Sequence, residues 1–282
     1  MTRTSPQLLA ALRERIRAIE AAGAPPRVLP FRIASLDAAL PGGGLALGAL
    51  HEVAGVGPDE EDGAVAAAFA AGILARLAAG DGSGQKAGGQ VLWCLAGDDL
   101  YGPGLAAVGL APPRLVVARA AGDIEVLWAM EEALQDRSVV GVLGEVAALP
   151  SGAGRRLQLA AEASGVTALV LRRWRSRQLA ARQRGRPSAA ATRWRVKALP
   201  SRVPPGEPGV GRPRWRIGAL PSVAAPGEPG VGRARWHVEL LRCRGGIPGS
   251  WIVEGCDASG HVALPAELAD RPDRAPHRAG RG

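Results

Sequence analysis

The sequence lacks the features expected of an exported, membrane-spanning or metal-binding protein. Its 282 residues include three cysteines, and no two of them form a C-x-x-C pair, which favours buried thiols in a reducing cytosol. The longest apolar run, around residues 64–75, is broken by glycine and is shorter than the ~20 residues that cross a bilayer. Early charges and the lack of an apolar h-region argue against a secretory signal. We therefore expect a cytoplasmic protein with no membrane partner and no metal site.

Lysine is absent from a stretch that otherwise looks like a nucleotide site. Residues 31–65 (FRIASLDAALPGGGLALGALHEVAGVGPDEEDGAV) predict a helical turn, a glycine bend, a buried strand at 49–54 and a loop entering a helix. In a phosphate-binding protein such a loop surrounds the phosphates with glycine N–H groups and supplies a lysine. Several glycines are present here, but no lysine or arginine lies between Glu52 and Leu74.

Carboxylates occupy the places where that loop would need donors to a phosphate. The four acidic residues are Asp59, Glu60, Glu61 and Asp62. Like charges 4 Å apart repel by ~1 kcal/mol in water and by ~4 kcal/mol at an effective dielectric constant of about 20, so these carboxylates oppose triphosphate binding. We predict no cofactor, no catalytic residue and no ATP turnover. A distorted nucleotide mode that uses glycine amides and a metal is the alternative.

The neighbouring residues His51 and Glu52 do not predict a metal or catalytic pair. They fall in the expected buried strand. Adjacent residues of a strand point to opposite faces of the sheet, so the two side chains cannot act together.

Positive charge is concentrated in the second half of the chain. Residues 151–282 hold 24 lysines and arginines against 9 acids, a net charge of +15, whereas residues 1–150 hold 11 against 17, a net charge of −6. This segregation favours a polyanion as the partner of the second half, and arginine enrichment on a solvated surface is the alternative.

Short apolar strands alternate with helices through the centre of the chain. Besides residues 49–54, strands are predicted at 90–96, 114–118, 139–143 and 166–171. Helices are predicted between them, at residues 64–78, 101–108, 123–135 and 154–163. Strands that are apolar on both faces and alternate with helices predict an α/β fold, with a mostly parallel sheet covered by helices on both sides.

Further segments flank or interrupt this predicted core of residues 25–270. Residues 1–24 predict an amphipathic helix whose leucine and isoleucine stripe needs cover from its own core or from a neighbouring protein. A 21-residue unit is duplicated at about 194–235 and predicts added antiparallel strands. Residues 271–282 form a charged tail that we expect to be disordered.

Tryptophans mark the duplicated unit and the strand after it. Trp194, Trp215 and Trp236 each follow an arginine, and we expect them to pack on the sheet rather than to stack on bases. Residues 235–242 and 250–256 predict a C-terminal hairpin.

Arginine dominates the segment that follows residues 166–171. Residues 172–186 read RRWRSRQLAARQRGR and contain no acid. Guanidinium groups pair with phosphates and tryptophan offers a stacking face, which suits single-stranded DNA bound without sequence preference. An acidic protein surface as partner and a plain solvated surface are the alternatives. The candidate DNA-binding residues are Arg172, Arg173, Trp174, Arg175, Arg177, Arg182, Arg184 and Arg186.

Several motifs, taken in order, resemble the ImuA family over most of residues 28–270. They are SLDAAL–PGGGLALGALHEV, VLWCLAGDDLYGPGLAAVGL, VGVLGEVAAL, ALVLRRW and LLRCRGG–SWIVE. Members of this family are bacterial relatives of the RecA core, typically encoded beside the Y-family-like protein ImuB and an alternative C-family replicative polymerase. The resemblance implies a RecA-like core with an accessory role in error-prone translesion synthesis during the SOS response.

The resemblance also shows where this sequence departs from an active RecA-type ATPase. The phosphate-loop pattern G-x-x-x-x-G-K-[ST] falls on residues 55–64, and Ala64-Val65 replace the lysine and hydroxyl pair. The magnesium-holding aspartate falls on Gly144, with Glu145 next to it. Near the place of the catalytic glutamate there is at best Asp98 or Asp99. The arginine-rich segment falls on the loop that contacts DNA in the RecA-like core.

The implied protein is a non-catalytic scaffold. Its implied partners are an ImuB-like Y-family polymerase homologue, an alternative C-family polymerase, RecA and single-stranded DNA. An atypical DNA-dependent ATPase and a cell-division inhibitor in the manner of SulA are the alternative functions.

Overall fold

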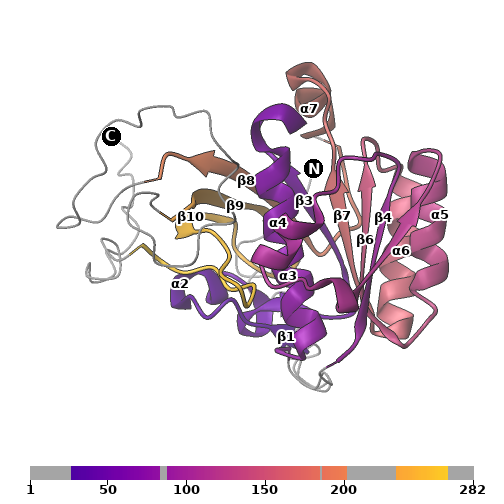
Figure 1. Cartoon of the computed structure of the whole chain (residues 1–282), viewed down its shortest axis with the longest axis horizontal. Helices are drawn as coiled ribbons and strands as arrows, with labels where there is room; N and C mark the ends of the chain where they lie inside the picture. Colours follow the sequence, from indigo (N-terminus) through magenta and orange to yellow (C-terminus); the bar gives the residue numbers. More distant parts are fainter. Residues whose placement is uncertain (1–26, 83–87, 185, 202–232, 266–282) are drawn as a thin grey trace, which may run out of the picture.

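The computed structural model describes residues 27–82, 88–184, 186–201 and 233–265 (Figure 1). The expected N-terminal helix, most of the duplicated unit with Trp215, and the C-terminal tail lie outside the described residues. The predictions made for those segments stay predictions.

An eight-stranded sheet forms the core, in the order β10-β9-β8-β3-β7-β6-β4-β5. Six of its strands run parallel: β3 (Leu50–Gly55), β4 (Gln90–Leu95), β5 (Leu115–Arg119), β6 (Val139–Val146), β7 (Thr167–Arg172) and β8 (Thr192–Leu199). Strands β9 (Arg235–Cys243) and β10 (Gly249–Glu254) continue the sheet in antiparallel fashion. The predicted α/β class, with its mostly parallel sheet and antiparallel C-terminal extension, is confirmed.

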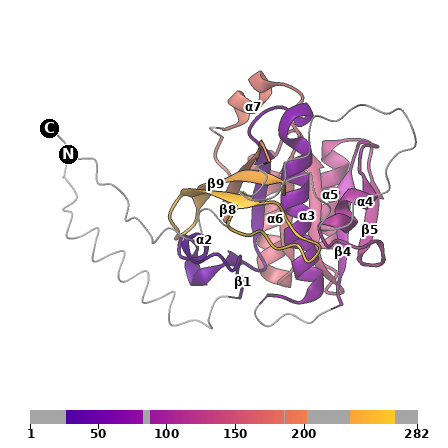
Figure 2. The same ribbon diagram turned by 60° about the vertical axis from the view of Figure 1, so that its left-hand side comes forward.

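Helices cover both faces of the parallel strands. Helices α3 (Ala64–Ala79) and α4 (Gly102–Ala107) lie on one side, and α5 (Asp123–Ala133) and α6 (Ser151–Ser164) lie on the other (Figures 1 and 2). The apolar side chains of β3, β4, β6 and β7 alternate between the two resulting cores, which is why these strands read as nearly continuous apolar runs. Glycines in the left-handed conformation, Gly80 and Gly165, end α3 and α6.

Short elements complete the described chain. They are β1 (Val28–Leu29), α2 (Ala34–Asp37), η1 (Pro41–Gly43), β2 (Leu45–Ala46), η2 (Asp59–Gly63), η3 (Pro112–Arg114) and α7 (Arg177–Arg184). Helix α7 corrects the expectation of a loop after β7: Ala180 is buried against Ala54 and Trp174, so this turn of the arginine-rich segment has an apolar side that packs as a helix.

The helix formed by η2 and α3 is the central helix of the fold. Its span, Asp59–Ala79, is long and apolar enough to cross a membrane, but 72% of its most apolar window is buried inside the protein. Phe69 of α3 lies 5.7 Å from the ring of Trp194, and Phe31 lies 5.5 Å from the same ring. Trp194 and Trp236 are both buried in this core, as predicted from the sequence.

Candidate functional site

The carboxyl ends of β3, β7, β6 and β4 meet at one edge of the sheet, where open α/β sheets bind their ligands. The connection from β3 to α3, residues 56–63, lies at this edge. It is not an open loop, because η2 continues directly into α3.

A carboxylate of the chain itself occupies the cradle that this connection forms. The backbone N–H of Gly57 donates to Oδ2 of Asp62 at 2.8 Å, and the backbone N–H of Ala198 donates to Oδ1 at 3.1 Å. Asp62 is only 4% exposed. A side chain at Gly55 would come within 2.8 Å of the Asp62 Cβ, so the cradle is filled up to the strand. Asp62 therefore takes the hydrogen bonds that a bound anion would need.

The run of acids in η2 has a local structural cause. All four carboxylates lie in the first turn of a helix that extends to Ala79. Negative charge is stabilising there because it faces the positive end of the helix dipole. An arriving phosphate would compete with these carboxylates for the same backbone dipoles.

Arg173 lies among three carboxylates that come from different parts of the chain. Its guanidinium is 3.2 Å from Asp59 Oδ2 and 3.4 Å from Glu145 Oε2, and it also pairs with Asp99. The indole N–H of Trp93 donates to Glu145 Oε1 at 2.7 Å. Within the described residues, no group of three or more histidine, cysteine or acidic side chains is arranged to hold a metal ion. An arginine thus supplies the positive charge among these three carboxylates.

The pKa shifts in this cluster follow from burial and from Arg173. Burial raises the pKa of Asp59 and of Glu145, and the charge of Arg173 opposes that rise. Burial by itself would lower the pKa of Arg173, but Glu145, Asp59 and Asp99 together raise it. The guanidinium is therefore the permanently charged group of the cluster.

A second ion-pair cluster is centred on Glu52 of β3. Glu52 Oε2 is 3.5 Å from Arg172 Nη1, and Glu52 Oε1 is 3.5 Å from Arg193 Nη2 and also accepts from the Ser188 hydroxyl. Burial lowers the pKa of Arg172, and the charge of Glu52 opposes that shift. One buried carboxylate therefore serves two arginines.

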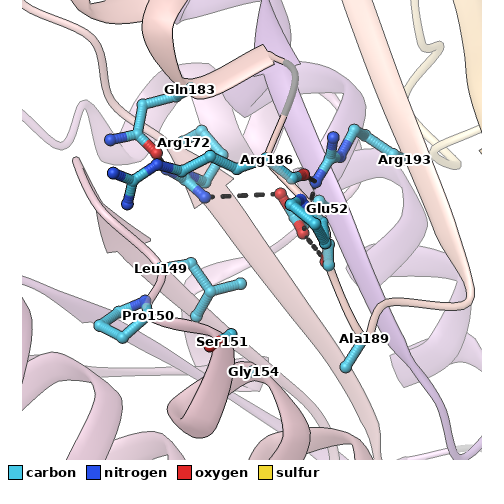
Figure 3. A pocket seen from close by; sticks show the side chains of 12 residues that line it. Glu52, Leu149, Pro150, Ser151, Gly154, Arg172, Gln183, Arg186, Ala189 and Arg193 are labelled. Carbon is cyan, nitrogen blue, oxygen red and sulfur yellow. Dashed lines mark hydrogen bonds and ion pairs between the residues drawn. The ribbon is translucent and has the colours of Figure 1, made fainter.

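A small pocket separates this cluster from the start of α6. Figure 3 shows Arg172, Arg193 and Glu52 joined by dashed lines on one side, with Pro150 and Ser151 on the other. The pocket wall is rich in donors, since Arg186 and Gln183 also line it.

His51 and Glu52 point to opposite faces of β3, as the alternation of a strand requires. The ring nitrogens of His51 lie 2.7 Å from Thr192 Oγ1 and 2.8 Å from the Ala46 carbonyl oxygen. Burial lowers the pKa of His51 to about 4, so its ring is neutral at pH 7. The pair has no joint site.

The structure divides the predicted DNA-binding segment into inward and outward side chains. Arg172 and Trp174 are 6% and 5% exposed, and Arg173 is held by the acids described above. A buried Trp174 presents no face for base stacking in this structure. The exposed members of the segment are Arg175, Arg177, Arg182 and Arg186. The side chain of Arg184 is not among those that the structure describes.

The chain matches known proteins over nearly its full length. It is 39% identical over 263 residues to Protein ImuA of Caulobacter vibrioides strain NA1000 / CB15N, an alignment that covers 91% of this chain and 96% of that protein. The chain belongs to the ImuA family. Protein ImuA of a second Caulobacter vibrioides strain, CB 15, matches with the same identity and coverage. No family model matches the chain.

In this ImuA family member the acidic connection and the arginine-rich segment, which are far apart in the sequence, lie in contact. Arg173 and Arg177, from the basic segment, pair with Asp59 and Glu61, from the acidic connection. Sequence reasoning also missed the pairing of Glu52 with Arg172 and Arg193. An acid within a strand predicted to be buried was the available signal, because buried acids are rare unless they are paired.

Proposed function

We propose that this protein is a non-catalytic accessory component of an error-prone translesion DNA synthesis complex in the SOS response. It acts in the cytoplasm and contacts an ImuB-like Y-family polymerase homologue and single-stranded DNA. Membership of the ImuA family supports the pathway. The observation that carries the non-catalytic role is the Asp62 carboxylate, which accepts the Gly57 and Ala198 N–H groups in the anion cradle.

Two internal ions take the place of a nucleotide and its metal. Asp62 supplies the anion, and Arg173 supplies a cation among Asp59, Asp99 and Glu145. A triphosphate would have to displace Asp62 and then face the remaining acids of η2 with no lysine beside it. The fold is kept while the site for ATP is filled by the chain.

The outward arginines of the basic segment support the contact with DNA. Arg175, Arg177 and Arg182 are exposed along or just before α7, at the same edge of the sheet as the filled cradle. Arg177 pairs with Glu61, so a DNA phosphate would exchange one exposed ion pair for another. This favours electrostatic binding that is reversible and independent of base sequence.

Replacing Arg175, Arg177 and Arg182 together by glutamine is expected to weaken binding to oligothymidylate about tenfold. Removing three phosphate contacts should also reduce the slope of log affinity against log salt by about 2, since each contact on a single strand contributes about 0.7. Fluorescence anisotropy over a series of salt concentrations measures both quantities.

The matched control replaces Arg114, Arg137 and Arg244, which are exposed at the opposite edge of the sheet, with glutamine. This variant has the same net charge as the test variant. If both variants lose affinity equally, the contact is a property of net charge and not of α7, and the assignment of this surface is wrong.

Copurification tests the assembly role directly. The tagged full chain is expected to retain the ImuB-like protein of its own organism on affinity resin in the absence of DNA and nucleotide. RecA and the alternative polymerase are tested in the same way, singly and with the ImuB-like protein present. Failure to retain any of the three would contradict a role as an assembly component.

A further inference from the structure

A second, small pocket adjoins the Glu52 cluster on the side of β8. It lies beneath the arginine-rich segment, and its lining includes Ala54, Trp174, Arg195 and Leu241. It shares Glu52, Arg172, Gln183 and Arg193 with the pocket in Figure 3.

Two buried donors in this wall have no acceptor. Trp174 is 5% exposed, and its indole Nε1–H has no hydrogen-bond partner among the described atoms. The same holds for Nε of Arg172. Native proteins rarely leave buried donors unpaired, so such atoms indicate an acceptor other than the described residues, either an ordered water or a bound group.

The charge of the lining favours a negatively charged acceptor. Glu52 is the acid in the lining, and its oxygens are already shared between Arg172, Arg193 and Ser188. Arg195 adds a further guanidinium, which pairs with Glu239. The pocket has an excess of positive charge, and an anion would relieve it.

The remaining wall is apolar and favours a carboxylate on a hydrocarbon stem over a phosphodiester. Ala54 and the indole of Trp174 form part of it, and Leu241 is a large hydrophobic side chain that is exposed to solvent. A peptide carboxylate fits both the donors and the apolar wall. Its oxygens accept from the donors, while a neighbouring apolar side chain of the peptide covers Leu241. A hydrated phosphate backbone would leave the apolar wall exposed to water.

We propose that this pocket is a docking site for a partner protein, which inserts the carboxylate of an acidic, leucine-containing peptide segment beside Trp174. The site uses the inward side chains of the segment, whereas the contact with DNA proposed above uses the outward ones. Either can therefore fail without the other.

Nuclear magnetic resonance of the full chain tests the site through the Trp174 indole N–H. That signal is identified as the one missing from the Trp174→Phe variant, which keeps an aromatic ring against Ala54 and removes the donor. The probe is a synthetic peptide of alternating aspartate and leucine. The Trp174 signal is expected to move downfield and to saturate as the N–H gains a charged acceptor, whereas the Trp251 signal, from β10, stays in place.

Comparison probes separate the chemistries. A peptide of alternating asparagine and leucine should leave the Trp174 signal unmoved. An unmoved Trp174 signal with the acidic peptide overturns the proposal. An equal shift with inorganic phosphate or oligothymidylate overturns it in favour of a general oxyanion site or a nucleic-acid site.

Two variants measure how much the pocket contributes to the affinity for the acidic peptide. Trp174→Phe is expected to weaken binding of the acidic peptide about tenfold, since a hydrogen bond to a charged acceptor is lost. The matched change Trp251→Phe should leave the affinity unchanged. Leu241→Asp places a negative charge at an exposed position of the pocket and should abolish binding even if Trp174→Phe does not fold; unchanged affinity in Leu241→Asp overturns the proposal.

Discussion

Replacing Glu52 by alanine is expected to lower the free energy of unfolding by about 3–5 kcal/mol. Glu52 is the carboxylate shared by Arg172 and Arg193, and Arg172 is 6% exposed. Without Glu52, the buried guanidinium of Arg172 loses the carboxylate that pairs with it. Denaturant unfolding followed by circular dichroism measures the loss.

The control for this prediction is an ion pair at the surface. Glu131 pairs with Arg156, whose side chain is 62% exposed, so Glu131→Ala is expected to cost less than about 1 kcal/mol. The double variant Glu52→Gln with Arg172→Met removes both charges and should be more stable than Glu52→Ala. If Glu52→Ala costs no more than Glu131→Ala, the buried cluster has been misassigned as a stabilising centre.

Replacing Asp62 by alanine is expected to cost about 2–4 kcal/mol, because Gly57 N–H and Ala198 N–H both lose a charged acceptor in a buried place. The loss of a negative charge from the first turn of the helix adds to this. Asp62→Asn keeps an acceptor and should lose about half as much. Glu60→Ala, an exposed acid in the same turn, is the matched control and should lose less than about 1 kcal/mol.

The same variants test whether Asp62 has replaced a nucleotide. Calorimetric titration of the unaltered chain with magnesium-ATP is expected to give no binding heat, and Asp62→Ala is expected to give none either, since no lysine is present to balance the triphosphate. Saturable binding by the unaltered chain would contradict the non-catalytic role. Binding that arises only in Asp62→Ala would show that Asp62 alone closes the cradle.

Much of the fold followed from periodicity. The strand predicted at residues 90–96 is β4, and the helix predicted at 64–78 is α3, each within one or two residues of its observed bounds. These elements are apolar on nearly every side, so their pattern is strong. The arginine-rich segment was harder to predict, because α7 contributes only Leu179 and Ala180 to its apolar contacts and its sequence looks like a polar loop.

The candidate site could be predicted only in part. The missing lysine and the acidic connection were visible in the sequence, and so was the concentration of arginine after β7. Which arginines face solvent was not visible. Arg172 ends β7, which is buried on both faces, so the alternation of side chains along β7 sets the face to which Arg172 points. The carboxylate that pairs with it, Glu52, lies 120 residues earlier in the chain.

The sequence by itself determined the class of fold, the loss of the phosphate-binding lysine and the separation of charge between the two halves of the chain. The tertiary structure decided what those charges do. Parallel strands bring their carboxyl ends to one edge of the sheet, so Arg173 meets Asp59, Asp99 and Glu145 although they are far apart in the chain. Coulomb attraction and burial then act between these neighbours in space, and no pattern along the chain specifies them.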